Sequence, residues 1–198
     1  MRAVPLQAGL GEIGLDQGTE AEEYAFRRQL RMAEERELPV IVHTPHENKP
    51  EGTERLVEMI QAEDVTEERI IIDHNTENTI DTSLQTDCWI GFTLYPGKIA
   101  DEKAIDLLEE YGTDKMILIL VAIRNWRISY PRGCEYLYEF IATSINSAAD
   151  WDPSDPLAVP KAGDKMLDRG WDREEVRKVV FDNPYEFFDK SPNFDYER

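Results

Sequence analysis

Cysteine, positive charge and long apolar runs are all scarce in this sequence. Each of these scarcities excludes some kinds of protein. The two cysteines, Cys88 and Cys134, do not have the spacing of a zinc site, and a reduced, cytoplasmic setting is the simplest expectation for them. A membrane helix needs roughly 20 apolar residues, and no run in the chain approaches that length. The first residues, MRAVPLQAGLGEIG, show no basic segment followed by an apolar one, so we predict neither a membrane span nor a signal peptide.

Positive charge is outnumbered along the whole chain. There are 22 Lys and Arg against 41 Asp and Glu, a net charge of −19, and the acidic residues do not gather in a tail. Such a surface repels the phosphate backbone of nucleic acids at low salt. High salt screens that repulsion within a few ångströms, and acidic surfaces keep proteins soluble there. We therefore interpret the net charge as an adaptation of the host organism to high salt. The charge does not exclude nucleic acid as a substrate.

Apolar runs of strand length alternate with amphipathic stretches. The expected strands are a segment that ends near Glu12 and residues 39–44, 69–73, 89–94 and 115–121, and the expected helices are residues 20–37, 51–63, 77–86, 101–111, 173–180 and 183–189. In the first two helices the residues expected to face the core are Tyr24, Leu30, Ala33, Leu56, Met59 and Ile60. This alternation predicts an α/β fold with a parallel sheet. A length of 198 residues with 41% hydrophobic content predicts a single domain, residues 1–198.

Two of the three histidines stand at a regular spacing with a glutamate. His43 lies 31 positions after Glu12, and His74 lies 31 positions after His43. One strand, one helix and two short turns take about 30 residues, so the three side chains are expected at the carboxyl ends of three successive parallel strands. Active sites of parallel barrels are built at that end. Carboxylate and imidazole groups are ligands of divalent cations, so the spacing predicts a metal site.

Residues 119–145 differ in character from both flanks. The segment reads ILVAIRNWRISYPRGCEYLYEFIATSI, carries a net charge of +1 within a chain of −19, and is rich in aromatic residues. We interpret it as an insertion, and we expect it to pack poorly or to project from the barrel.

Five motifs together resemble those of the TatD-type metal-dependent hydrolases, a branch of the amidohydrolase-like TIM barrels. They are GEIGLD at 11–16, VIVHTPH at 40–46, IIIDHN at 70–75, NSAADW at 146–151 and NPYEFF at 183–188. Their form and the acidic bias resemble the branch found in salt-loving archaea. The resemblance implies a (β/α)8 barrel that binds divalent metal ions (Mg, Mn or Zn) and hydrolyses phosphodiester bonds in DNA by a metal-activated water.

The resemblance also implies roles for four residues. Glu12 matches the carboxylate that bridges two metal ions, and His43 and His74 match two single-histidine ligands. Asp150 matches the strand-end aspartate that binds metal and orients or deprotonates the attacking water. The resemblance covers most of the chain except residues 124–143.

Two departures from the family pattern bear on activity. The family begins with a strand that carries His-x-His, and this chain has no such motif. It starts where the third barrel strand is expected, and a full barrel takes about 250 residues. The insertion also falls within the seventh expected strand. We therefore expect an incomplete, N-terminally truncated barrel with weak activity, or an inactive remnant that oligomerises through an open sheet edge.

Each candidate residue also has a structural interpretation. Glu12 can belong to an ion pair, and His43 and His74 can be buried core histidines. Asp150 stands in DWDPSDP, and turns rich in Asp and Pro are ordinary.

Three further side chains follow expected strand ends on the same rim. Lys49 and Lys98 can hold a phosphate or carboxylate of the substrate, or they can be exposed lysines. His46 can contact the substrate, or it can be a loop residue. Hydrolysis of an amide or ester bond is the alternative within the same chemistry, because fold does not fix substrate. The sequence does not predict an oligomeric state.

Overall fold

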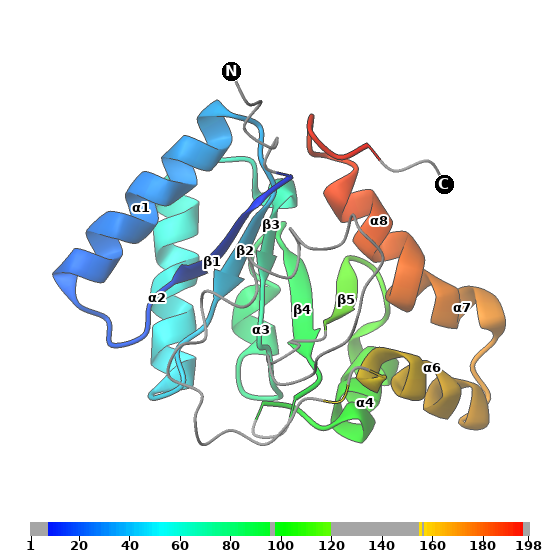
Figure 1. The fold of residues 1–198 in the computed structure, drawn as a ribbon. Helices are drawn as coiled ribbons and strands as arrows, with labels where there is room; N and C mark the ends of the chain where they lie inside the picture. The colour runs from blue at the N-terminus through cyan, green and yellow to red at the C-terminus, as the bar shows by residue number, and fades with distance from the viewer. Residues whose placement is uncertain (1–7, 96–97, 120–154, 156, 196–198) are drawn as a thin grey trace.

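The computed structural model describes residues 8–95, 98–119, 155 and 157–195. Within them, five strands form one parallel sheet in which every strand pairs with the next in sequence (Figure 1). The strands are β1 (Leu10–Gly14), β2 (Val40–His43), β3 (Ile70–Ile72), β4 (Trp89–Thr93) and β5 (Met116–Ile119). Consecutive strands of a (β/α)8 barrel have this arrangement. The predicted α/β fold with a parallel sheet is confirmed.

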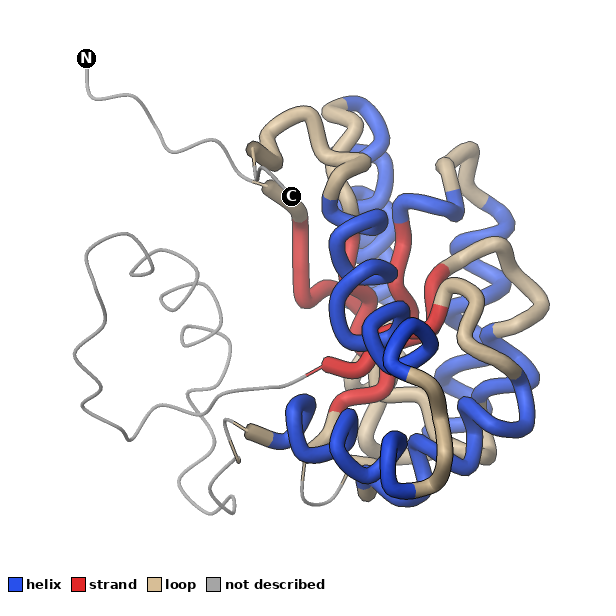
Figure 2. The backbone as a smooth tube through the Cα atoms, turned by 90° about the vertical axis from the view of Figure 1, so that its right-hand side faces the viewer, coloured by secondary structure: helices blue, strands red, loops and turns tan. Residues whose placement is uncertain are grey.

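Helices connect the strands and follow the last of them. They are α1 (Glu20–Glu35), α2 (Lys49–Ala62), the 3-10 turn η1 (Glu67–Arg69), α3 (Ile80–Ser83), α4 (Asp101–Tyr111), α6 (Ala158–Asp168), α7 (Arg173–Arg177), the π-helical turn η2 (Lys178–Asp182) and α8 (Asn183–Phe188). Figure 2 shows most of the helices on one side of the strands. No helix in the described ranges is long and apolar enough to cross a membrane.

Alternate residues of each strand face opposite sides of the sheet. Val42 and Ile72 pack against α1 and α2 on the outer face, together with Phe26, Leu30, Leu56, Met59 and Ile60. Ile90 and Phe92 continue this outer face under α4, α6 and α7. On the inner face a smaller cluster joins Ile71, Trp89 and Ile117 to Phe187 of α8. The inner face therefore carries few large apolar side chains, and polar groups occupy its carboxyl end.

The N-terminus of α1 is fixed next to the site by side chains. Thr19 caps the helix, and the side chain of Glu22 accepts a hydrogen bond from the Thr19 backbone N–H, which completes a capping box. Arg55 of α2 forms a two-point ion pair with Glu23, at 2.6 and 2.8 Å. The pair ties the first turn of α1 to α2 at the carboxyl end of the sheet.

Two predictions about the elements need correction. The helix expected at 77–86 is the single turn α3, because Asn75, Thr79 and Ser83 bind each other through their side chains instead of continuing a longer helix. Tyr24 is 67% exposed, and Phe26 takes its expected place in the core. The expected strand 115–121 corresponds to β5 from Met116 to Ile119, and residues 120 and 121 lie outside the described residues. The predicted insertion at 119–145 lies outside the described residues except for Ile119.

Gly14 is required where β1 passes close to β2. A Cβ at this position would collide with the carbonyl oxygen of His43. We expect Gly14→Ala to lower the free energy of unfolding by about 1–3 kcal/mol, as overpacking does, measured as the shift in the urea midpoint.

Gly18→Ala is the matched control for that steric effect. Its φ of +67° strains any side chain, but a Cβ there meets no described atom within 4 Å, so we expect a loss of about 1 kcal/mol or less. A Gly14→Ala variant no less stable than this control would contradict the close approach of the two strands.

Cys88 precedes β4 and is 3% exposed. Its burial raises the pKa of the thiol to about 12, so very little thiolate forms near neutral pH, and the thiolate is the reactive species. We expect iodoacetamide at about pH 8 to leave Cys88 unmodified in the folded protein, as peptide mass spectrometry would show. The unfolded protein should react fully, and equal labelling in both states would contradict the burial.

Candidate metal centre

Side chains alternate between the two faces of the sheet along each strand, and this explains why the inner face is polar at its carboxyl end. Ile41 and Ile71 belong to the inner cluster, so His43 and Asp73, two positions further on, face the same side. Ile13 belongs to the outer cluster, which places its neighbour Glu12 on the inner side. Three ionisable groups from three neighbouring strands therefore converge at one end of the sheet.

The strand register differs from the one that the equal spacing predicted. β2 and β3 pair with a separation of 30 residues, Val42 with Ile72, so Asp73 and not His74 is equivalent to His43. In β1 the residue opposite His43 is Gly14, and the register between β1 and β2 shifts along the pair. The three predicted residues thus do not occupy equivalent strand positions, although their side chains meet.

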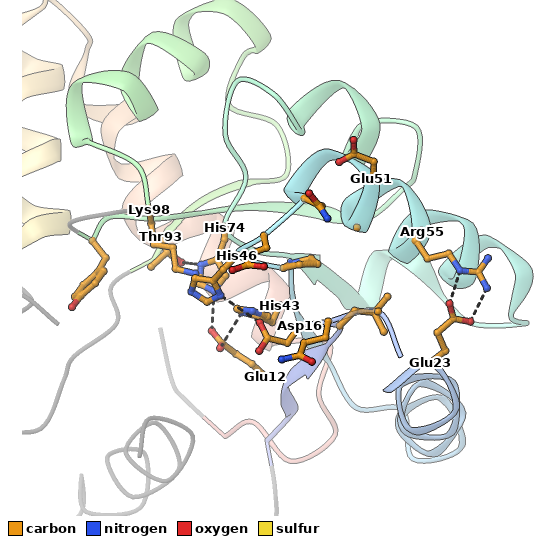
Figure 3. Close-up of a pocket in the computed structure, with 18 residues that line it drawn as sticks. Glu12, Asp16, Glu23, His43, His46, Glu51, Arg55, His74, Thr93 and Lys98 are labelled. Carbon is orange, nitrogen blue, oxygen red and sulfur yellow. Dashed lines mark hydrogen bonds and ion pairs between the residues drawn. The ribbon is translucent and has the colours of Figure 1, made fainter. Parts of the chain in front are cut away.

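Glu12, His43 and His74 form a group that we call the inner triad (Figure 3). Each offers one ligand atom, and these atoms lie within 4.8 Å of one another. Glu12 Oε2 is 3.8 Å from His43 Nδ1, and Glu12 Oε1 is 3.6 Å from His74 Nε2. Two ligands about 2.1 Å from one ion are at most about 4.2 Å apart. A small approach of the three side chains would therefore place them around one cation.

His74 reaches the cavity through an unusual backbone conformation. Its φ of +62° is left-handed, which is rare for a residue with a side chain. The Asp73 carboxylate accepts a hydrogen bond of 2.6 Å from the His74 backbone N–H, and Asn75 N donates to the Gly91 carbonyl. These contacts hold the strained residue, and strain held in this way is typical of functional sites.

A hydrogen-bond chain determines which nitrogen of His74 faces Glu12. Thr93 Oγ1 lies 2.7 and 2.8 Å from the two Asp73 carboxylate oxygens and 2.9 Å from His74 Nδ1. Because the hydroxyl gives its one proton to the carboxylate, it accepts from His74 Nδ1–H. The Nε2 lone pair of His74 then faces Glu12 Oε1. A histidine ligand is commonly held in this way by a carboxylate behind it.

The space for the Asp73 carboxylate depends on Gly91 of β4. A Cβ at Gly91 would lie 2.7 Å from Asp73 Oδ1 and 3.0 Å from a methyl carbon of Ile71. The glycine therefore permits a fully buried carboxylate between two strands.

The local electrostatics suit a cation. Burial lowers the pKa of His43 to about 3 and the pKa of His74 well below its usual value, so both imidazoles are neutral with a lone pair available. Burial, and then the charge of Asp73, raises the pKa of Glu12 to about 7, although the Glu12 side chain is 36% exposed. The two imidazoles therefore add no positive charge beside Glu12 and Asp73, and the nearby Lys98 ammonium offsets the rise in the pKa of Glu12 only in part.

One atom of the inner triad tests the fit of a metal ion directly. Among the described residues, His43 Nδ1 is buried and has no hydrogen-bond partner. Buried polar groups in proteins are nearly always paired. The unpaired nitrogen lies beside Glu12, and a cation there would satisfy it. The donor set of one carboxylate and two imidazoles fits a divalent transition metal.

The inner triad opens into a cavity of about 1000 Å³. Thr93, Asp16, His46 and Lys98 line it near the triad, and the ion pair of Arg55 with Glu23 lines its far side (Figure 3). The cavity is large enough for a substrate to reach the triad.

The predicted substrate-binding residues are placed differently from one another. Lys98 Nζ lies 2.8 Å from His46 Nε2, and both side chains line the cavity. Lys49 Nζ instead donates to Thr44 Oγ1 at 2.7 Å, and Lys49 is not among the residues that line the cavity within the described part of the chain. Burial, with Lys98 nearby, lowers the pKa of Lys49 to about 8. Asp150 lies outside the described residues, and its role stays a prediction.

Sequence reasoning assigned no role to Asp73, Thr93 or Asp16. The spacing of 30 residues between His43 and Asp73 was a signal for the first, because it matches the strand–helix repeat. Thr93 looks like an ordinary β-branched strand residue, and its position on the inner face emerges only with the register.

The comparisons with known proteins agree with this geometry. Residues 4–118, more than half of the chain, match the TatD related DNase family. An uncharacterized metal-dependent hydrolase of Methanocaldococcus jannaschii is 31% identical over 104 residues, which are 52% of this chain and 41% of that protein.

Two solved structures share the fold. The TatD-like protein of Archaeoglobus fulgidus has a TM-score of 0.62 at 23% identity, over 92% of this chain and 60% of its own. A structure from the engineering of organophosphate hydrolysis activity from a weak promiscuous lactonase template has a TM-score of 0.64 at 21% identity, over 95% of this chain and 59% of its own. This chain therefore spans less than two thirds of the length of each of these three proteins.

The parallel sheet has the fold of the amidohydrolase-like class of TIM barrels, and a carboxylate–histidine group lies at its carboxyl end. Within that class, the chain belongs to the TatD related DNase family.

Proposed function

We propose that this chain is a divalent-metal-dependent hydrolase that cleaves phosphodiester bonds, with Glu12, His43 and His74 as ligands of one metal ion. The observation that supports the proposal most strongly is the convergence of three ligand atoms within 4.8 Å of one another at the base of a large cavity. The family match supports the phosphodiester bond as the one cleaved, because the family is described as related to a DNase.

A divalent cation at the inner triad would act as a Lewis acid and would make a water molecule nucleophilic near neutral pH. The chain's own residues supply the remaining parts. Asp73 and Thr93 orient His74, and the Lys98 ammonium at the cavity wall can hold a phosphate oxygen. His46, which contacts Lys98, positions that ammonium. Asp150 is proposed to orient or deprotonate the attacking water.

Hydrolysis of an ester, lactone or amide bond is the second candidate, and the charge of the cavity favours it. Five carboxylates line the cavity, those of Glu12, Asp16, Glu23, Glu47 and Glu51, against two cationic side chains, Lys98 and Arg55. Arg55 is already paired with Glu23 and Glu58. This surplus of negative charge opposes a polyanion at low salt and does not oppose a small neutral substrate.

The two functions separate in one assay with four substrates. Purified full chain, loaded with Mg²⁺, Mn²⁺ or Zn²⁺ in high salt, is tested on single-stranded DNA, a bis-nitrophenyl phosphodiester, a nitrophenyl ester and a small lactone. High salt is used because it screens the repulsion between DNA and a chain of net charge −19. We expect metal-dependent cleavage of the phosphodiester and of DNA, abolished by a chelator.

Two variants accompany the assay. Glu12→Gln removes a proposed ligand, and Glu51→Gln removes another carboxylate of the same cavity that is outside the inner triad. Only the first should abolish cleavage. Cleavage of the ester or lactone alone would transfer the proposal to the second function, and cleavage that survives Glu12→Gln would contradict both.

A further inference from the structure

A second group of possible ligands lies at the mouth of the same cavity. Asp16, His43 and His46 offer one ligand atom each, and these atoms also lie within 4.8 Å of one another. His46 Nδ1 is 3.7 Å from Asp16 Oδ1, and the rings of His43 and His46 are 5.1 Å apart between centroids. We call this group the outer triad. Asp16 follows β1 and His46 follows β2, so the outer triad joins the loops after these two strands, and both residues line the cavity.

We propose that the outer triad is a second divalent-cation site. One carboxylate and two imidazoles form a mixed donor set that suits Zn²⁺, Mn²⁺ or Co²⁺ better than Mg²⁺ or Ca²⁺, which take oxygen ligands. The site rests on the proposed function only in that it shares His43 with the inner triad, and its own ligands Asp16 and His46 have no part in the inner one.

Exposure distinguishes the two sites. The side chains of Asp16 and His46 are 65% and 43% exposed, whereas that of His74 in the inner triad is 3% exposed. Exposed ligands lose more freedom when they are ordered, and their charges are better screened by water. The outer site should therefore bind its cation more weakly than the inner site.

Lys98 already supplies a cation at the outer triad. Its ammonium contacts His46 Nε2 at 2.8 Å, and Glu12 and Asp16 both act on it through their charges. His46 Nε2 accepts from the Lys98 ammonium, whereas Nδ1 is the nitrogen beside Asp16. A cation bound at Nδ1 would place the ring proton on Nε2, which then cannot accept from Lys98, and the two positive charges repel each other at this distance. Binding of the metal should displace the lysine from His46.

His43 connects the two sites. It lies between His74 and His46, with ring centroids at 4.9 and 5.1 Å. A neutral imidazole has one lone pair for a metal, so a second ion either competes for His43 or binds through Asp16 and His46 alone, and this weakens the second step. A substitution at His43 should therefore weaken both sites, while substitutions of Asp16 or His46 should weaken only the outer one.

Calorimetric titration of the metal-free full chain with Zn²⁺ tests the proposal, in about 1 M KCl to screen the charge of the chain. The wild-type chain is expected to bind two ions, one tightly and one at least about tenfold more weakly. Asp16→Asn and His46→Gln should each remove the weak step and leave the tight one within about threefold. Glu12→Gln should remove the tight step and leave the weak one.

Two further variants test the shared histidine and the exchange of cations. His43→Gln should weaken both steps, and Lys98→Met should tighten the weak step several-fold. Glu51→Gln, which removes an exposed carboxylate from the same cavity, should change neither step. A single ion in the wild-type chain that Glu12→Gln removes, or a weak step that survives both Asp16→Asn and His46→Gln, would overturn the outer site. A weak step unchanged or weakened in Lys98→Met would contradict the exchange. A wild-type chain that lacks the tight step, but binds an ion that Asp16→Asn and His46→Gln each remove, would refute the proposed function and not this inference.

Discussion

Glu12→Gln is expected to abolish tight binding of a divalent cation and to lower the rate of hydrolysis by at least 10²–10³-fold, on the order seen when one group of an electrostatic site is removed. Glu12 supplies the one carboxylate of the inner triad, and it faces both His43 Nδ1 and His74 Nε2. A glutamine has nearly the same shape but no negative charge, so it cannot balance a cation held by two neutral imidazoles.

The measurement for Glu12→Gln pairs metal affinity with rate. Affinity for Mn²⁺ is measured by calorimetry, and kcat is measured at saturating metal with the substrate that the wild-type chain cleaves best. The urea midpoint of the metal-free variant serves as the control for folding, and it should stay close to that of the wild-type chain. A variant that keeps wild-type affinity and rate would remove Glu12 from the site.

The second large effect is expected at the Asp73–Thr93–His74 chain. In Asp73→Asn the side-chain amide can donate to Thr93 Oγ1, so the threonine proton would move to His74 Nδ1 and His74 would keep its own proton on Nε2. The nitrogen that faces Glu12 would then have no lone pair. We expect metal affinity to fall about 100-fold, at the upper end for residues that support metal ligands.

Thr93 provides the matched pair of variants for that effect. Thr93→Val keeps the branched shape and loses the hydroxyl, and we expect an affinity loss of about tenfold. Thr93→Ser keeps the hydroxyl that lies 2.9 Å from His74 Nδ1 and should stay close to the wild type. Ring ¹⁵N chemical shifts of His74 in the metal-free chain report the protonated nitrogen directly. The same tautomer in Asp73→Asn as in the wild type, or an equal loss in Thr93→Ser and Thr93→Val, would show that the hydrogen-bond chain does not orient His74.

The sheet could be predicted from sequence because its strands are short apolar runs separated by amphipathic helices. Residues 40–42 and 70–72 are continuous runs of β-branched residues, each followed by a polar residue, and such runs are typical of buried parallel strands. The helix at 77–86 was overestimated for a local reason. Ser83 and Thr79 donate to Asn75 Oδ1, and hydrogen bonds of this kind compete with the backbone bonds of a helix.

The candidate site could be predicted only in part. Glu12, His43 and His74 were found from residue type and spacing, and the structure brings them together. Their equal spacing of 31 positions does not correspond to an equal register, because β2 and β3 pair 30 residues apart and His74 turns inward through a left-handed φ. No spacing in the sequence reports such a turn. The side chains that orient His74 therefore become visible only in the structure. The same is true of the hydrogen bond from Lys49 to Thr44.

The central claim is that Glu12, His43 and His74 hold one divalent cation. Anomalous diffraction from crystals of the full chain grown with Mn²⁺ tests it most directly, because the anomalous signal locates the ion without reference to activity. The prediction is a peak about 2.0–2.2 Å from the Glu12 carboxylate and from one nitrogen each of His43 and His74. A strong peak held by other residues, with Glu12 and the two imidazoles left without an ion, would contradict the claim.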